Sequence, residues 1–428
     1  MTSDSLQKTL RYRWIIFWIL ASGYILVYFH RLCPSVVAVD MMKDLNAGGT
    51  LTGFLAAAYF YPYTVMQLPA GLLSDFWGPR NTITLFFGIA AVGSFMLGVA
   101  PSSFWAILGR ALVGLGVAML FVPTMKVLAE WFRVREFAMM TGILMAMGGL
   151  GSWMAAKPLA LLSVEIGWRN SFIVVGIFTL ILVVLVWIFV RDKPADKGWP
   201  SPRASDQQET AAIGLAEGVK KVLSSSAFWP MAGWFFFNFA IFFSFGGLWG
   251  GPYLKHVYGY SEGQDGHILS MLAVGMIVGS PLLSYLSNNV VKARKPLLVF
   301  SSAVMVIITA VLTFLTDQCS IFGLYLVCLG TGVFGSAVVV IGFTSTKELF
   351  PVQMAGTATG LINLFPFAGG AVFPPILGYI LERHGRVGDA FIASGYRQAF
   401  MVLFVCAVIA LISSLFVKET LAKESVSG

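Results

Sequence analysis

Two basic residues lie deep inside apolar stretches of this sequence, and their chemistry is that of anion binding. If these stretches are membrane helices, Arg31 lies about 7 Å and Lys157 about 10 Å outward of the midpoint of its segment, at 1.5 Å per residue. Such a charge costs a few kcal/mol or more in a bilayer. No Asp or Glu lies deep in a nearby segment, so we expect an anionic ligand as the partner. The alternative is that each side chain extends to the interface, as we expect for Lys126 at the cytoplasmic end.

Aromatic and polar side chains recur at helical spacing beside these cations. Tyr24, Tyr28 and Arg31 stand at i, i+4 and i+7, and therefore share one helix face. Four further sets share a face in the same way: Tyr59, Tyr63 and Gln67; Trp153 and Lys157; Asn238, Phe242 and Trp249; and Asn363 and Phe367. Aromatic walls with a few directed polar groups suit a small organic solute. Each aromatic residue is equally compatible with helix packing.

His30 precedes Arg31, and an imidazole can titrate near neutral pH. It is a candidate for proton coupling or for a hydrogen-bonding neighbour of the pocket. The sequence offers no buried carboxylate for an acid-based proton relay, so a coupling proton and a counter-anion both stay open. The four cysteines lie singly and no ATP-binding motif occurs, so we expect no metal, no cofactor and no enzymatic activity.

Membrane helices must position these residues, as the composition indicates. Of the 428 residues 57% are hydrophobic and 11% are charged, and the mean hydropathy is +0.82. A soluble globular protein carries roughly 25% charged residues. A soluble enzyme, a disordered chain and a nucleic-acid binder are therefore excluded. Runs of about 20 apolar residues, enough to cross a bilayer, occur near 14–39, 51–73, 82–100, 103–126, 137–163, 171–190, 228–254, 266–288, 297–316, 320–346, 355–381 and 398–417. The prediction is an all-α membrane protein with twelve transmembrane helices.

Lysine and arginine set the orientation of such a protein. With the N-terminus inside, the inner loops and both tails hold eighteen basic residues, and the outer loops hold six. We therefore expect both termini to be cytoplasmic, in the inner (plasma) membrane of a cell. The net charge of +8 follows from this topology and requires no nucleic-acid partner.

The chain repeats itself after a shift of 218 residues. The matches include Gly114 with Gly332, Glu130 with Glu348, Phe132 with Phe350, and Thr141-Gly142 with Thr359-Gly360. The predicted domains are a six-helix bundle at 1–190, a cytoplasmic linker at 191–226 with an amphipathic stretch near 213–223, and a second bundle at 227–428. Transporters are commonly built from such repeats, with the substrate site between them.

A loop motif identifies the family that the chain resembles. The segment Gly71-Leu-Leu-Ser-Asp75-Phe-Trp-Gly78-Pro-Arg80 resembles the GxLaDrxGrr signature of the major facilitator superfamily. Arg110-x-x-x-Gly114-x-Gly116 resembles the family's second motif. The resemblance covers almost the whole chain and implies two pseudo-symmetric six-helix bundles, usually working as a monomer. It also implies that the loop motif holds one conformation of an alternating-access cycle, and we assign a conformational role to Gly71, Asp75, Gly78, Arg80 and Arg110.

Three segments resemble the sugar-phosphate and organic-anion permease branches of this family. They are Tyr28-Phe-His30-Arg31, Leu248-Trp249-Gly-Gly-Pro252-Tyr253-Leu254 and Lys347-Glu348-Leu-Phe-Pro351. Many carriers of these branches hold their anion with an arginine at the position of Arg31. His30 stands where the anion–cation symporters often have Asp, and Asn238 stands where sugar-phosphate antiporters carry a second arginine.

The expected function is secondary active transport of a small organic anion: a carboxylate, a sugar acid or a sugar phosphate. The alternative is a facilitator or symporter for a neutral or zwitterionic solute such as a sugar or peptide. The substrate itself cannot be carried over from the resemblance, because of the departures at His30 and Asn238.

Overall fold

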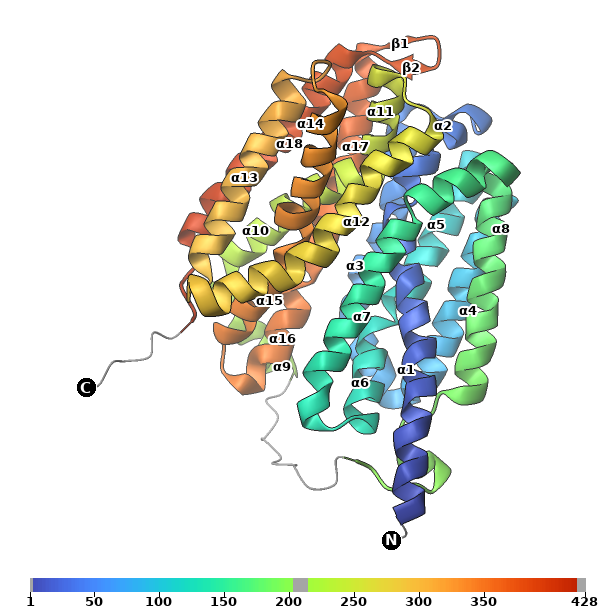
Figure 1. Cartoon of the computed structure of the whole chain (residues 1–428), viewed down its shortest axis with the longest axis vertical. Helices are drawn as coiled ribbons and strands as arrows, with labels where there is room; N and C mark the ends of the chain where they lie inside the picture. The colour runs from blue at the N-terminus through green and yellow to red at the C-terminus, as the bar shows by residue number, and fades with distance from the viewer. Residues whose placement is uncertain (1–2, 203–214, 422–428) are drawn as a thin grey trace, which may run out of the picture. The chain divides into compact units, whose positions relative to one another are not determined.

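The structure is a computed structural model that describes residues 3–202 and 215–421. Residues 203–214 of the predicted linker lie outside the described part. Almost every described residue is helical, and ten helical segments are long and apolar enough to cross a membrane. The predicted all-α membrane fold is confirmed, and several spans consist of two or three consecutive helices (Figure 1). The other two of the twelve predicted spans correspond to α3 and α7, which lie outside these ten segments.

The elements follow the chain in this order. The first half contains α1 (Ser3–Leu32), α2 (Pro34–Asp44), α3 (Gly49–Trp77), α4 (Pro79–Gly98), α5 (Ser103–Ala118), α6 (Phe121–Trp131), α7 (Val134–Met154), α8 (Lys157–Phe189) and η1 (Pro194–Lys197). The second half contains α9 (Leu215–Leu223), α10 (Phe228–Ile241), η2 (Phe242–Trp249), α11 (Gly250–Tyr258), α12 (Glu262–Tyr285), η3 (Leu286–Val290), α13 (Lys295–Phe314), α14 (Ile321–Gly330), η4 (Thr331–Ala337), α15 (Val339–Glu348), α16 (Val352–Ile362), α17 (Leu364–His384), β1 (Arg386–Val387), β2 (Ala390–Phe391) and α18 (Ala393–Phe416). The two strands form a short antiparallel hairpin.

Two predicted spans break next to a proline. The helix α1 ends before Pro34, and α7 ends shortly before Pro158. A proline has no N–H group to bond the carbonyl four residues earlier, so a helix tends to end there. The second break falls between Trp153 and Lys157, where Ala156 has non-helical dihedral angles. The expectation that these two residues share a face of one continuous helix is therefore wrong.

The second half contains three π-helical segments, η2, η3 and η4. A π-helix closes its hydrogen bonds over five residues rather than four. Because η2 begins at Phe242, after Asn238, and ends at Trp249, the 3.6-residue spacing does not set the register of Asn238 and Trp249.

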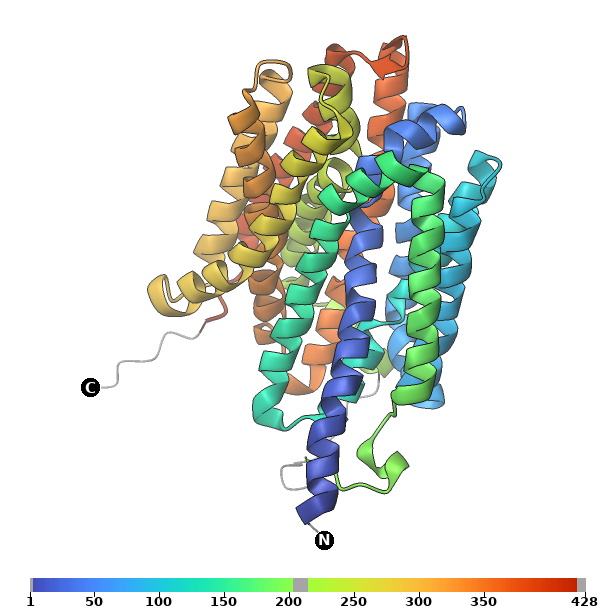
Figure 2. The same ribbon diagram turned by 45° about the vertical axis from the view of Figure 1, so that its right-hand side comes forward.

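The described helices form two compact units. Of the described residues, the first contains 3–33 and 58–202, and the second contains 34–57 and 215–421. In the first unit, α1 lies along α7, and α4 packs against α5 and α8 (Figures 1 and 2). In the second unit, α10 packs against α17 and α18, and α13 packs against α18.

Residues 34–57 belong to the second unit through specific contacts. The backbone N–H of Gly251 donates to Ser35 Oγ at 3.0 Å, and the N–H of Thr50 donates to Glu382 Oε2 at 3.0 Å. A side chain at position 251 would collide with the backbone of Ser35, so glycine permits this close approach of α11 to α2.

Candidate anion-binding site

Arg31 lies in the last turn of α1 and is almost fully buried, with 6% of its surface exposed. Its Nη2 atom donates to the hydroxyl of Tyr63 at 2.5 Å. Its guanidinium carbon lies 4.4 Å from the ring centre of Tyr28 and 4.9 Å from that of Tyr63. The guanidinium is therefore held between one tyrosine of its own helix and one of α3, an arrangement stabilised by cation–π attraction.

A second buried arginine extends this arrangement. Tyr59 stacks on Tyr63, with ring centres 5.5 Å apart and planes inclined by 21°. The guanidinium carbon of Arg110, from α5, lies 5.1 Å from the ring centre of Tyr59. We call the set Tyr28, Arg31, Tyr63, Tyr59 and Arg110 the arginine–tyrosine stack. Its members are two cations and three neutral phenols, so its formal charge is positive, which favours an anion.

Two further predicted residues flank the arginine–tyrosine stack. Tyr24 contacts Tyr28, with ring centres 5.4 Å apart, and its hydroxyl lies 3.6 Å from the sulfur of Met145 in α7. Gln67 donates from Nε2 to the backbone carbonyl of Tyr63 at 3.2 Å. The spacings that placed Tyr24 with Tyr28 and Gln67 with Tyr63 thus correspond to contacts between neighbouring helix turns.

His30 faces a different helix from its neighbour Arg31. Its ring is fully buried and stacks on Phe172 of α8, with ring centres 6.5 Å apart. Neither ring nitrogen has a hydrogen-bond partner among the described residues. The backbone carbonyl of His30, by contrast, accepts a hydrogen bond from Arg110 Nη1 at 2.9 Å. A coupling role of the imidazole stays a prediction.

Lys157 and Trp153 lie on either side of the break between α7 and α8. Lys157 is half-buried, and 39% of the Trp153 surface is exposed. In the described part of the chain, no hydrogen bond or ring contact joins either residue to the arginine–tyrosine stack. The second guanidinium beside the tyrosines comes instead from Arg110, which the sequence placed only among the conformational motifs.

The remaining predicted site residues belong to the second compact unit. Asn238 is buried and donates from Nδ2 to the carbonyl of Gly335 at 2.7 Å. Trp249 is also buried and donates from Nε1 to the carbonyl of Pro374 at 3.0 Å. Asn363 is half-buried at the junction of α16 and α17. The side chains of Asn238 and Trp249 thus each donate a hydrogen bond to a backbone carbonyl.

Sequence reasoning missed a buried carboxylate. Asp265, near the start of α12, is fully buried, and its Oδ2 atom lies 3.8 Å from Lys255 Nζ. The expectation of no buried acid is wrong here, because α11 packs against α12 and brings Lys255 close to Asp265. A signal was present: Ser261 and Gln264 form a capping box, which places Asp265 inside the helix rather than in the loop.

The loop motif forms polar contacts within the first unit. Asp75 makes an exposed ion pair with Lys126 of α6. The guanidinium of Arg80 donates to the carbonyl of Trp187 at 2.6 and 3.0 Å and lies over its ring. The backbone N–H of Arg80 donates to Asp192 Oδ1 at 2.7 Å. The motif thus joins α3 to α6, and α4 to the end of α8.

Gly78 and Gly71 play different parts in this loop. Gly78 has a φ of 78°, a conformation that side-chain-bearing residues rarely adopt, and it turns the chain from α3 into α4. Apart from its own helix backbone and chain neighbours, no described atom lies within 4 Å of where a side chain of residue 71 would begin. Close packing among the described residues therefore does not require a glycine at 71.

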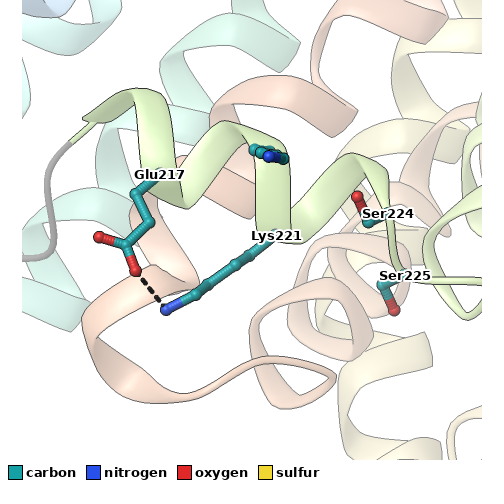
Figure 3. A pocket seen from close by; sticks show the side chains of 5 residues that line it. Glu217, Lys221, Ser224 and Ser225 are labelled. Carbon is teal, nitrogen blue, oxygen red and sulfur yellow. Dashed lines mark ion pairs between the residues drawn. The ribbon is translucent and has the colours of Figure 1, made fainter.

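A hollow of about 440 Å³ lies at the end of α9 (Figure 3). Glu217, Lys220, Lys221, Ser224 and Ser225 line it, and Lys221 Nζ lies 2.6 Å from Glu217 Oε1. The hollow has no aromatic wall and contains none of the predicted site residues. It differs in chemistry from the predicted substrate pocket.

Comparison with known proteins gives the family and the fold. A family model described as Major Facilitator Superfamily matches residues 20–374 and 249–427. The chain is 24% identical to a probable sulfoacetate transporter of Cupriavidus necator, over 98% of this chain and 97% of the relative. It is also 24% identical to a probable galactarate/D-glucarate transporter of Bacillus subtilis, over 95% and 94%. The crystal structure of a bacterial homologue of the human lysosomal transporter Spinster has the same fold, with a TM-score of 0.72 at 18% identity and coverage of 95% and 96%.

Proposed function

Because the chain belongs to the Major Facilitator Superfamily, we propose that it is a secondary active transporter that moves a small organic anion across a membrane by alternating access. The substrate class is a carboxylate, a sugar acid or a sugar phosphate. In this proposal the protein works as a monomer, without cofactor or catalytic activity. Both termini lie in the cytoplasm.

The arginine–tyrosine stack carries the proposal. Arg31 and Arg110 are 6% and 1% exposed, and the residues between them are neutral tyrosines. Burying a guanidinium in a membrane protein costs free energy, so such residues mark substrate or ion pathways. An anion that approaches Arg31 gains a charge-assisted hydrogen bond and aromatic walls on two sides.

The relatives support an anionic substrate. The two relatives are named as probable transporters of sulfoacetate and of galactarate or D-glucarate, and each of these solutes carries a carboxylate or sulfonate group. Each alignment spans almost the full length of both chains. We propose that Arg31 holds the negative group and that Tyr24, Tyr28, Tyr59, Tyr63 and Gln67 surround it. Trp153, Lys157, Asn238, Trp249 and Asn363 stay predicted substrate-binding residues.

A ligand screen with a matched variant tests this proposal. The thermal stability of the purified protein would be measured with sulfoacetate, D-glucarate, glucuronate and glucose 6-phosphate, and with glucose as the neutral comparison. We expect at least one anion to raise Tm and glucose to leave it unchanged. Arg31→Gln should abolish the shift, whereas Arg169→Gln, which removes a charge from α8, should keep it. Stabilisation by glucose that survives Arg31→Gln would favour the neutral-solute alternative.

A further inference from the structure

The end of α1 carries a backbone carbonyl that its own helix cannot satisfy. The carbonyl of His30 would normally accept a hydrogen bond from the N–H group of residue 34. Residue 34 is a proline, which has no N–H group. Arg110 Nη1 lies 2.9 Å from this carbonyl oxygen and 3.7 Å from the sulfur of Cys33. The arginine side chain therefore supplies an N–H donor in place of the one that Pro34 lacks, beside the weaker thiol donor of Cys33, whose sulfur lies 3.6 Å from the same oxygen.

Close packing of α5 on α3 places Arg110 there. Gly114 lies one turn after Arg110, and a side chain at 114 would collide with the backbone of Tyr59. Tyr59 in turn donates its hydroxyl to the carbonyl of Val27 at 3.3 Å. Two side chains, from α5 and α3, thus hold the carbonyls of residues 27 and 30. These carbonyls belong to the last two turns of α1, which carry Arg31.

We propose that Arg110 is a positioning residue for Arg31: by giving the His30 carbonyl the N–H donor that Pro34 cannot supply, it fixes the last turn of α1 and so orients the anion-binding guanidinium. This inference rests on the proposed function. It also gives the sequence Arg110-x-x-x-Gly114 a physical role, in which the glycine brings α5 close and the arginine reaches α1.

The location of the hydrogen bond from Arg110 to the His30 carbonyl explains why its loss should change the orientation of Arg31. The break between Leu32 and Pro34 is where the first compact unit ends and residues of the second begin. A helix end without a satisfied carbonyl frays easily. Fraying by one turn would include Arg31 and would separate it from Tyr63. Arg110 prevents this while the chain remains broken at residue 33.

The competing role for Arg110 is direct contact with the anion. Its Nε and Nη2 atoms have no hydrogen-bond partner among the described residues. Positioning and direct contact predict different responses to Pro34→Ala. An alanine at 34 restores the missing N–H group and lets the backbone bond the His30 carbonyl itself. It cannot replace a guanidinium that touches the ligand.

The test is a double-mutant cycle on anion affinity. Isothermal titration with sulfoacetate and D-glucarate would compare wild type, Arg110→Met, Pro34→Ala and the double variant. We expect Arg110→Met to weaken binding about tenfold, as for loss of one well-placed hydrogen bond to a charged group. The double variant should bind within about threefold of Pro34→Ala alone. A double variant as weak as Arg110→Met would overturn the positioning role.

Two controls distinguish an effect on the orientation of Arg31 from a loss of protein stability and from a failure of the proposed anion site. Val113→Ala shortens a fully buried side chain of α5; it should lower Tm and leave Kd unchanged within about twofold. Arg110→Lys keeps a charged donor group and covers the case in which Arg110→Met does not fold. When Pro34 is present, the Arg110→Lys protein should bind the anion more tightly than the Arg110→Gln protein. When residue 34 is alanine, the two proteins should have equal affinities for the anion. If Arg31→Gln retained full affinity, the proposed anion site would fail, irrespective of the rescue by Pro34→Ala.

Discussion

Asp192 and Glu419 occupy the same place in the two halves of the chain. Asp192 lies three residues after α8 ends at Phe189, and Glu419 lies three residues after α18 ends at Phe416. Asp192 accepts a hydrogen bond from the backbone N–H of Arg80 at 2.7 Å, at the start of α4. Glu419 accepts from the N–H groups of Arg294 and Lys295 at 2.8 and 3.0 Å, at the start of α13.

These contacts place a carboxylate at the N-terminus of the third transmembrane helix of each half. The first N–H groups of a helix lack partners within it, and the helix dipole favours a negative charge there. The repeat is thus visible in the structure, because Asp192 and Glu419 both accept hydrogen bonds at the start of the corresponding helix, although Asp and Glu differ in length.

The two caps should stabilise the fold. We expect Asp192→Ala and Glu419→Ala, which remove the acceptor oxygens, each to lower the free energy of unfolding by about 0.5–2 kcal/mol, the range for loss of a helix cap. Thermal unfolding in detergent measures this. Asp317→Ala, which removes an exposed ion pair with Arg397, is the matched control and should change little. If Asp317→Ala lowered the free energy of unfolding as much as Glu419→Ala, capping would not be the cause.

The pH dependence of the two caps should have opposite signs. Burial acts to raise the pKa of Glu419, but four backbone N–H groups hold it below its ordinary value. Its contribution to stability is therefore present above an ordinary carboxyl pKa of about 4 and is lost as the pH falls through its lowered native value. Burial raises the pKa of Asp192, so its contribution is present at acid pH and is lost as the pH rises through its raised native value.

Comparing Tm between pH 3.5 and pH 7 tests these signs. The gap between wild type and Glu419→Gln should widen toward neutral pH, whereas the gap between wild type and Asp192→Asn should narrow. If the difference in Tm from the wild type changed with pH in the same direction for both variants, the opposite signs assigned to Asp192 and Glu419 would be contradicted.

Arg31→Lys should impair transport although it keeps the charge. Lysine is a point charge without the planar fork that fits between Tyr28 and Tyr63 and can bind two oxygens of one anion. We expect a tenfold to hundredfold rise in Kd, corresponding to about 1.5–3 kcal/mol. Uptake into proteoliposomes and titration of the anion measure it, with Arg169→Lys as the control. Normal transport by Arg31→Lys would leave only a general electropositive pocket.

Lys157 is predicted to hold the same anion as Arg31. If it does, the losses of binding in Arg31→Gln and Lys157→Gln should not add in the double variant, because both residues then contact one ligand. Lys157→Arg should be milder than Arg31→Lys. Binding losses that sum simply in the double variant would place the two residues in separate environments.

Asp75→Asn should slow transport more than it weakens binding. Asp75 pairs with Lys126, is largely exposed, and makes no described contact with the arginine–tyrosine stack. We therefore expect it to act on the conformational equilibrium, with a reduced rate of uptake and a Kd for the anion close to that of the wild type. Equal proportional losses of rate and affinity would argue against this role.

The sequence by itself determined what depends on local composition and spacing. The number of spans follows from the length of the apolar runs, because a bilayer has a fixed thickness. The contact of Tyr24 and Tyr28 with each other, and of Arg31 with Tyr28, follows from the periodicity of one helix. The buried position of Arg31 follows in part from the sequence, because the charge of an arginine inside an apolar run needs a compensating partner.

Only the tertiary structure decided which groups from different helices meet. Arg110 reaches the carbonyl of His30 because Gly114 brings α5 onto α3, and no spacing within one helix predicts a distance between two. The break at residues 155 and 156 separated Trp153 from Lys157, since a spacing rule assumes a continuous helix. Asp265 is buried because α11 covers it, and burial by a neighbouring element is a property of the packed chain rather than of any segment read alone.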